Sequence, residues 1–193
     1  MIHSCSGVVP KRLCPVHIHY CARTFLGTHF ETKNQTVVLK KSVNAQVPIV
    51  YQVISDIARY QEFMPYCVES YVSQKNKSSR VPEAAGLRVQ FRNYDETFAC
   101  KVSCIPTSNN SWRVVAESVT HSLFTFLQTK WTIEQHPTRP NASAVELTIS
   151  YQFKSSLYNS VASIFGKSMA QIVMKAFEKR IFLVRKESEA TSA

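Results

Sequence analysis

The chain has 193 residues, 45% of them hydrophobic, which is enough for one domain with a hydrophobic core. Its 23 Lys and Arg residues exceed its 13 Asp and Glu residues, and this basic balance fits nucleic acid, an anionic membrane surface or a basic import signal. No run of apolar residues approaches the ~20 residues that a membrane-spanning helix needs, so the sequence predicts no such helix.

The amino-terminal segment is basic and has no acidic residue before Glu31. It contains three basic residues together with several Ser and Thr residues, and it shows no strong helix or strand pattern. This composition is typical of a mitochondrial transit segment, and the alternative is a disordered tail. We expect residues 1–31 to be the transit segment and residues 32–193 to form one domain.

The predicted elements of the domain begin with a strand over residues 36–45. An amphipathic helix starts at Pro48, and a short helical turn over residues 60–64 is stopped by Pro65. A polar loop is expected over residues 76–86. Strands with alternating apolar residues make up the middle of the domain. These expected strands cover residues 68–75, 87–92, 98–104, 112–119, 126–135 and 145–153.

The last strand and the helix after it define the predicted architecture. Residues 145–153 give the clearest alternation of apolar and polar side chains in the chain. A helix over residues 156–186 would exceed ~40 Å in length, enough to cross a whole sheet. Its expected apolar face consists of Leu157, Val161, Phe165, Met169, Ile172, Ala176 and Leu183. We therefore predict an α+β fold in which a curved antiparallel sheet wraps around a long carboxy-terminal helix, with room for a cavity between them.

The domain has few residues that could bind a metal or a phosphate. Its histidines are His121 and His136, and no cluster of His, Cys and carboxylate residues has metal-ligand spacing. Its glycines, Gly86 and Gly166, form no glycine-rich phosphate loop. Its three cysteines are odd in number and form no CxxC motif, which excludes a full disulfide framework. We expect no metal site.

The strongest catalytic candidate is Glu96, which shares a strand face with Phe98 and Cys100. Inside an apolar cavity its carboxyl would have a raised pKa and could act as an acid or base, and the alternative is a solvated residue at a strand start. Cys67 has no basic neighbour in the sequence that would activate its thiol. Aromatic residues of the strands share a face with Leu and Val, so we do not expect a nucleic-acid-binding sheet.

Apolar residues also concentrate at two segment boundaries. One is the stretch FMPYC, residues 63–67, at the end of the short helical turn, and the other is SLFTFLQTKW, residues 122–131. Such residues either fill an ordinary core or line the mouth of a cavity and touch a membrane. Both interpretations stay open on the residues alone.

Five segments together resemble a known family, in the same order and spacing over residues 36–186. They are VYQVISDIARYQEFMPYCVESYV, AGLRVQFRNYDETFAC, SLFTFLQTKW, VELTISYQFKSSLYNSV and VMKAFEKR. The chain resembles the mitochondrial coenzyme Q-binding proteins of the START-like, polyketide cyclase-related superfamily. The stretch RPNA, residues 139–142, makes it most similar to the fungal members.

This resemblance implies a helix-grip fold that encloses a lipid cavity. It implies binding of ubiquinone or a polyprenylated precursor, without catalysis, in the mitochondrial matrix beside the inner membrane. The family supports respiration and ubiquinone synthesis by delivering or chaperoning the quinone. The implied protein partners are the complexes of ubiquinone synthesis or of respiration. The resemblance implies no cofactor besides the bound quinone, and no nucleic acid. We expect the far end of a long tail to stay in the membrane or in a second protomer.

Residues of both segment boundaries, the strands and the long helix form the expected site. The residues expected to line the cavity are Phe63, Pro65, Tyr66, Val89, Phe91, Phe98, Leu123, Phe124, Leu127, Trp131, Phe165, Met169, Ile172 and Ala176. The residues expected to contact the membrane are Phe124, Phe126, Lys130 and Lys167. The Tyr66 hydroxyl is a candidate hydrogen-bond partner for a quinone oxygen, since a buried hydroxyl needs a partner.

Two other hypotheses remain beside the quinone carrier. The first is a cyclase- or aromatase-type enzyme that uses Glu96 and Tyr66 as acid and base. The second is an interaction module of the ubiquinone synthesis or respiratory complexes, in which the cavity has no function. A Glu96→Gln variant separates the carrier from the enzyme, because only the enzyme would lose its activity.

Overall fold

A computed structural model describes residues 34–91, 94–108, 110–120, 122–155 and 159–191, without the side chains of residues 108 and 159–165. All of these residues belong to one compact unit, Glu31–Ala193. The predicted transit segment, residues 1–31, lies outside the described residues and stays a prediction.

The described residues form one antiparallel sheet and two α-helices with a 3-10 helix. The elements in chain order are β1 (Gln35–Val43), α1 (Val47–Ser55), η1 (Ile57–Glu62), β2 (Cys67–Lys75), β3 (Pro82–Phe91), β4 (Tyr94–Ser108), β5 (Ser111–Ser118), β6 (Phe124–Gln135), β7 (Ser143–Phe153) and α2 (Asn159–Thr191). The strand order across the sheet is β1-β7-β6-β5-β4-β3-β2. Sequential strands from β2 to β7 are therefore neighbours, and β1 is the edge strand beside β7.

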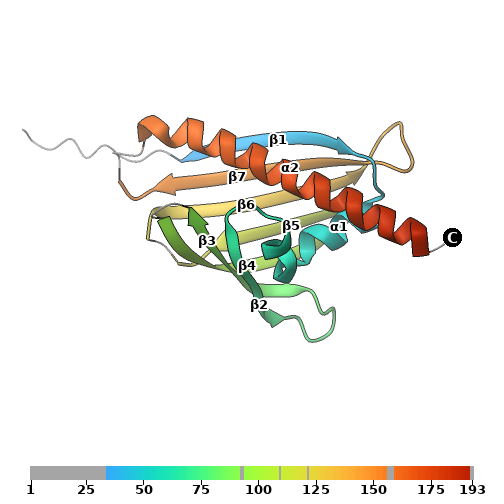
Figure 1. Ribbon diagram of the computed structural model, residues 1–193, viewed down its shortest axis with the longest axis horizontal. Helices are drawn as coiled ribbons and strands as arrows, with labels where there is room; N and C mark the ends of the chain where they lie inside the picture. The colour runs from blue at the N-terminus through green and yellow to red at the C-terminus, as the bar shows by residue number, and fades with distance from the viewer. Residues whose placement is uncertain (1–33, 92–93, 109, 121, 156–158, 192–193) are drawn as a thin grey trace, which may run out of the picture. The chain divides into compact units, whose positions relative to one another are not determined.

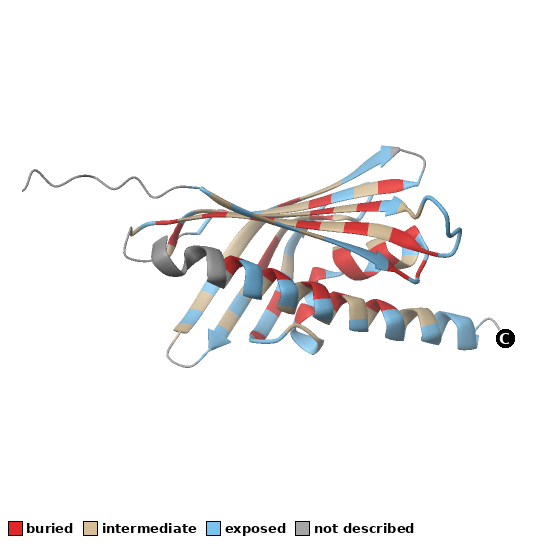
Figure 2. Cartoon of the chain, turned by 90° about the horizontal axis from the view of Figure 1, so that it is seen from above, coloured by how far each residue is buried: buried red, intermediate tan, exposed pale blue. Residues whose placement is uncertain are grey.

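The long helix α2 crosses one face of this sheet (Figure 1). It packs against β1, β7 and α1, and α1 in turn packs against β5 and β6 on the same face. Buried residues form a band where the sheet and α2 face each other (Figure 2). The predicted α+β arrangement of a curved antiparallel sheet around a carboxy-terminal helix is confirmed.

The pattern of β7 explains why this face is the buried one. Its side chains alternate between buried and half-buried along the whole strand, as the sequence predicts for residues 145–153. Leu147 and Tyr151 are among the most completely buried side chains of the protein. Because neighbouring strands are paired in register, the apolar face of β7 continues across β6 and β5.

Helix α1 also agrees with its predicted position. Its first turn contains Pro48, whose missing amide N–H costs no hydrogen bond there, and it buries Val50 and Ile54. The predicted second helical turn is the 3-10 helix η1, which ends at Glu62. The Tyr60 hydroxyl donates a hydrogen bond to the backbone oxygen of Ile54, so η1 is fastened to α1.

The predicted loop over residues 76–86 is wrong in its second half. β3 begins at Pro82 and pairs with β2 from there on. The segment is rich in Ala and Gly, so it has weak strand propensity, and the pairing comes from its neighbours. The ring of Tyr71 on β2 covers Gly86, where a Cβ atom would lie 2.3 Å from the ring.

The predicted apolar face of α2 is rotated from the observed one. The buried side chains are Ala170, Met174, Phe177 and Ile181, whereas Leu183 is 41% exposed. Gly166 lies on the buried side, where a Cβ atom would come within 2.3 Å of the Tyr151 hydroxyl oxygen. A residue with a side chain at this position would therefore clash with Tyr151 in the observed rotation of the helix. The predicted face residues Leu157, Val161 and Phe165 lie outside the residues whose side chains are described.

Candidate functional site

An apolar cavity of about 190 Å³ is lined by the concave face of the sheet and by α2. Strands β3 to β7 supply most of the wall, through residues such as Leu87, Val102 and Ile149. The helix contributes Val173 and Phe177. No Asp, Glu, Lys, Arg or His is among the described residues that line it. The cavity is therefore suited to an uncharged, largely hydrocarbon molecule.

Phe177 closes one side of this cavity as the centre of an aromatic cluster. Its ring centroid lies 5.0 Å from that of Tyr60, 5.1 Å from that of Phe63 and 4.8 Å from that of Trp131. The contacts with Tyr60 and Phe63 are edge-on, and such contacts stabilise beyond the buried area alone. Phe177 is only 1% exposed, so its ring is enclosed by its neighbours on this side of the cavity.

The polar groups that line the cavity are few and mostly engaged with the protein. The Ser118 hydroxyl donates to the backbone oxygen of Thr120 at 2.7 Å, and the Tyr60 hydroxyl donates to the Ile54 oxygen. Burial raises the pKa of the Cys100 thiol to about 11. This thiol is therefore protonated near neutral pH and is a poor nucleophile.

An ion pair joins η1 to α2, and a second one within η1 positions the shared carboxylate. Arg59 donates two hydrogen bonds to Glu62, at 2.7 and 2.8 Å, and Arg180 of α2 donates to the same carboxylate at 3.1 Å. The hydrogen bonds from Arg59 lower the pKa of Glu62. The Arg180 guanidinium also lies 5.8 Å from the ring centroid of Phe63. These contacts couple the position of η1 to that of α2.

The structure brings part of the predicted site together. Val89, Phe98, Leu127 and Trp131 line the cavity. Phe63 packs against the aromatic cluster but does not line the space itself. These positions follow from strand alternation, which places every second residue of a strand on the concave face.

Three predicted wall or gate residues instead lie on the surface. Pro65 is exposed, Tyr66 is 40% exposed and Phe91 is 45% exposed, so none of them lines the cavity. The Tyr66 and Phe91 rings pack edge-to-face with centroids 4.7 Å apart. Tyr66 has a φ of 67°, a left-handed conformation that costs free energy for a bulky residue. Its hydroxyl is not placed to meet a ligand inside the cavity.

Phe124 differs from both roles that the sequence predicts for it. It is 5% exposed and stacks on Phe153 with centroids 4.7 Å apart, so it offers no surface to a membrane. Leu123 is half-buried, and neither residue lines the cavity. An irregularity in the pairing of β6 with β7 between Phe124 and Phe126 turns Phe124 inward. Phe126 itself is half-buried.

The rotation of α2 displaces the predicted helix floor. Met169, Ile172 and Ala176 are half-buried and do not line the cavity, and the side chain of Phe165 lies outside the described residues. The helix residues that line it are Val173 and Phe177. Sequence reasoning missed both, although their spacing of four residues is a signal of one helical face.

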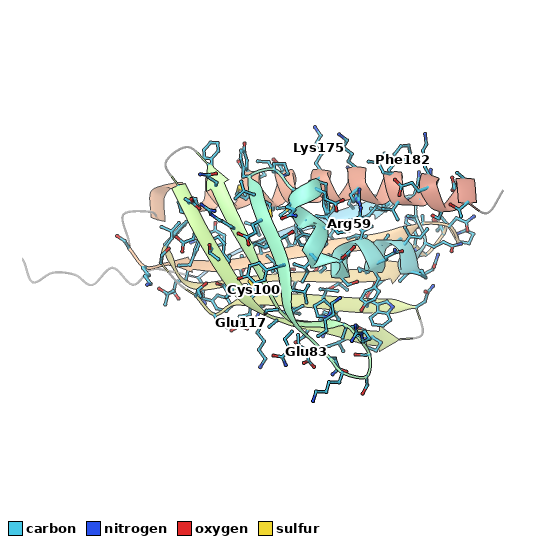
Figure 3. All side chains as sticks on the ribbon, turned by 60° about the horizontal axis from the view of Figure 1, so that its bottom comes forward. Arg59, Glu83, Cys100, Glu117, Lys175 and Phe182 are labelled. Atoms are coloured by element: carbon cyan, nitrogen blue, oxygen red, sulfur yellow. The ribbon has the colours of Figure 1, made fainter. Side chains whose placement is uncertain are left out.

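The predicted membrane-contacting lysines lie on different elements. Lys130 is half-buried on β6, on the face opposite to the cavity, and Lys167 is exposed on α2. Figure 3 shows Lys175 and Phe182 on the outer side of α2, pointing away from the sheet. Exposed basic and apolar side chains therefore occur together on this outer side of the helix.

The catalytic candidates are not gathered at the cavity. Glu96 is half-buried and does not line it. Cys67 is buried, its thiol donates to the Glu69 backbone oxygen, and burial raises the pKa of that thiol. Among the described residues no group of His, Cys, Asp and Glu could hold a metal ion. No helix within the described part of the chain is long and apolar enough to cross a membrane.

Comparison with known proteins identifies relatives that align with most of the chain. The model of the family "Polyketide cyclase / dehydrase and lipid transport" matches residues 43–178. "Coenzyme Q-binding protein COQ10, mitochondrial" of Eremothecium gossypii is 49% identical, over 94% of this chain and 90% of the relative. The protein of the same name from Saccharomyces cerevisiae is 46% identical, over 90% of this chain and 85% of the relative.

The fold is shared with solved structures at much lower identity. A START superfamily protein from Mycobacterium smegmatis superimposes with a TM-score of 0.67 at 16% identity, over 77% of this chain and 98% of that protein. The resemblance to fungal members that the sequence segments predict is confirmed. The chain belongs to the family of mitochondrial coenzyme Q-binding proteins, within the polyketide cyclase / dehydrase and lipid transport family.

Proposed function

We propose that the chain binds ubiquinone or a polyprenylated precursor in the cavity beneath α2 and delivers or chaperones it without catalysing a reaction. The observation that carries this proposal is an apolar cavity whose described lining contains no ionisable carboxylate, amine or imidazole. The relatives' name, coenzyme Q-binding protein, supports the choice of ligand. Burying the ligand's apolar surface supplies the binding free energy, at ~25 cal/mol per Å².

The size of the cavity limits what it can enclose. An engineered apolar cavity of ~150 Å³ is known to bind benzene, and the space here is about 190 Å³. One substituted ring fits such a volume, whereas a long isoprenoid tail does not. The tail would leave past Met64 and Val89, which line the cavity next to the exposed pair Tyr66 and Phe91.

A membrane surface is the proposed partner at this exit. The exposed rings of Tyr66 and Phe91 are suited to the boundary between headgroups and acyl chains. Each Lys or Arg near an anionic leaflet adds about 1 kcal/mol to the attraction. The relatives are named mitochondrial, and we place the protein in the matrix, peripherally on the inner membrane, where it would meet the ubiquinone synthesis or respiratory complexes.

Catalysis of the cyclase or aromatase type is disfavoured at this site. The family description includes cyclases, but Glu96 does not line the cavity and Tyr66 lies outside it. The hydroxyl of Tyr60 is already engaged, and burial raises its pKa. A general acid or base must reach the reacting atom within hydrogen-bond distance, and these residues do not surround one common space.

Lipid extraction tests the proposal directly. The chain would be purified from a host that makes ubiquinone, extracted with organic solvent and analysed by mass spectrometry. Leu127→Lys places a charge in the cavity, and Gln128→Lys places the same charge on the opposite face of β6 beside Glu117. We expect bound quinone in the wild type and in Gln128→Lys, and none in Leu127→Lys.

Two results would contradict this function. One is a folded wild-type protein that carries scattered phospholipid or no lipid. The other is a Leu127→Lys protein with a wild-type circular dichroism spectrum that still carries the quinone in full amount. Either would favour the interaction module over the carrier.

A further inference from the structure

Thr129 brings a hydroxyl into the cavity wall that forms no hydrogen bond within the described part of the chain. It lies on β6 between Leu127 and Trp131 on the concave face, and all three line the cavity. Its neighbours across the sheet are Ala116 on β5 and Ile149 on β7, which also line the cavity. The hydroxyl is thus set in an otherwise hydrocarbon patch.

The hydrogen bonding of this hydroxyl differs from that of the other hydroxyls in the wall. Ser118 and Tyr60 each donate to a backbone oxygen, but Thr129 forms no hydrogen bond with any of the described residues. A hydroxyl in an apolar wall is costly unless it finds a partner. Valine has the same shape and a high strand propensity, so threonine brings no packing advantage at this position.

We propose that the Thr129 hydroxyl is the hydrogen-bond partner of a ring oxygen of the ligand, which places the quinone ring, and not the tail, in the cavity. This inference rests on the proposed function and assigns the ligand class more narrowly. A polyprenyl or acyl chain has no oxygen to offer in this patch and would leave the hydroxyl unpaired. A carbonyl-bearing ring satisfies the hydroxyl and fits the volume of about 190 Å³.

The chemistry of a hydroxyl also defines what this contact does not select. It can donate to the carbonyl of an oxidised ring and can accept from the hydroxyl of a reduced ring. Thr129 therefore distinguishes an oxygen-bearing ring from a hydrocarbon without distinguishing the two redox states. The surrounding residues, Leu127, Trp131, Ala116 and Ile149, supply shape and burial only.

The test compares four proteins and two probes by titration calorimetry. The proteins are the wild type, Thr129→Val, Thr129→Ser and Thr132→Val. The last makes the same substitution on the same strand but on the opposite face, where Thr132 pairs with Arg113 and Glu146. The probes are a short-tailed ubiquinone and dimethylnaphthalene, a carbonyl-free hydrocarbon with about as many heavy atoms as the substituted quinone ring.

We expect Thr129→Val to weaken short-tailed ubiquinone binding about fivefold to tenfold, the effect of one neutral hydrogen bond. Thr129→Ser and Thr132→Val should bind like the wild type, and Thr129→Val should bind dimethylnaphthalene at least as tightly as the wild type. The carbonyl stretching band of the bound quinone should shift to higher frequency in Thr129→Val, because the hydrogen bond is lost.

Three outcomes would overturn the inference, and they differ in scope. If the wild type binds ubiquinone and Thr129→Val binds it equally well with an unchanged carbonyl band, the ring does not meet Thr129 and the proposed function stands. If the wild type binds no ubiquinone, the proposed function fails as well. Equal weakening of both probes by Thr129→Val would also refute the hydrogen bond, since it would indicate a general change in the wall.

Discussion

Replacing Ala116 with leucine should fill the cavity and separate the stability of the fold from ligand binding. Ala116 lies on the central strand β5, opposite Val102 and Thr129, and its side chain lines the cavity. Empty space lowers stability by ~24 cal/mol per Å³ in core substitutions, so a cavity of about 190 Å³ corresponds to about 4–5 kcal/mol. The ligand-free protein therefore has stability to gain from any side chain that fits.

The expected gain in the free energy of unfolding comes from burying the additional carbons of leucine. Three added carbons at ~0.8 kcal/mol each give about 2.4 kcal/mol, and ordering the leucine side chain removes ~0.5–1 kcal/mol of it. We expect the free energy of unfolding, measured by urea denaturation without ligand, to rise by about 1–2 kcal/mol. Ubiquinone binding to Ala116→Leu should fall by at least about tenfold, because the side chain occupies the ring's volume.

Ala144→Leu is the matched control, since Ala144 lies on β7 between the buried Ser143 and Val145 and faces the other side of the sheet. This control should change stability by less than about 0.5 kcal/mol and leave binding unchanged. The reasoning is refuted if Ala116→Leu folds, is more stable and still binds ubiquinone as the wild type does. A loss of stability by Ala116→Leu would show instead that the cavity has no free space.

Two further predictions concern the packing around the cavity. Gly166→Ala should destabilise the protein by about 1–3 kcal/mol in thermal unfolding, because the added Cβ atom would clash with the hydroxyl of the buried Tyr151. Alanine usually stabilises a helix relative to glycine, so a rise in melting temperature would contradict this prediction. Glu62→Gln should lose the ion pairs with Arg59 and Arg180 and be less stable than the wild type near pH 7. Hydrogen bonds from Arg59 lower the pKa of Glu62, so the stabilisation is present above the ordinary carboxyl pKa and is lost as the pH falls through the lowered pKa. Urea denaturation of both proteins should therefore show a difference in unfolding free energy at neutral pH that disappears in acid. A difference that stays constant with pH would argue against the ion pairs.

The positions of the strands were largely predictable, because apolar and polar residues alternate along them in the sequence. The run from residue 145 to residue 153 has one apolar residue at every second position, and that face is buried. The same rule places Val89, Phe98, Leu127 and Trp131 at the cavity. Predicting that these residues line the cavity requires only strand alternation and the knowledge of which face of the sheet is concave.

The rotation of α2 was not predictable from its own sequence. Apolar residues occur on more than half of its circumference, and Phe182 and Leu183 stay exposed. The buried side is set by the close approach of Gly166 to Tyr151, a contact between residues of separate elements. Helical periodicity alone cannot anticipate such a contact, and the predicted face was therefore displaced.

A local irregularity explains the error at Phe124. Strict alternation would place Phe124 and Leu127, three residues apart, on opposite faces of β6. The pairing shift between Phe124 and Phe126 adds one residue, so Phe124 pairs with Phe153 and Leu127 with Tyr151 on the same buried side. A residue beside a loop thus becomes part of an aromatic core and not of a membrane contact.

Several features of this domain lower its stability without helping it to fold. Small residues, Ala85 and Ala116, line the sheet where larger ones would fill the cavity. Thr129 adds to the same wall a hydroxyl without a hydrogen bond to the described residues, and Tyr66 beside the cavity keeps a left-handed backbone. Natural proteins retain such departures from good packing mainly where function requires them. A surface-contact module would gain stability from a filled cavity, whereas a carrier of a quinone-bearing lipid needs the space, the hydroxyl and the opening together.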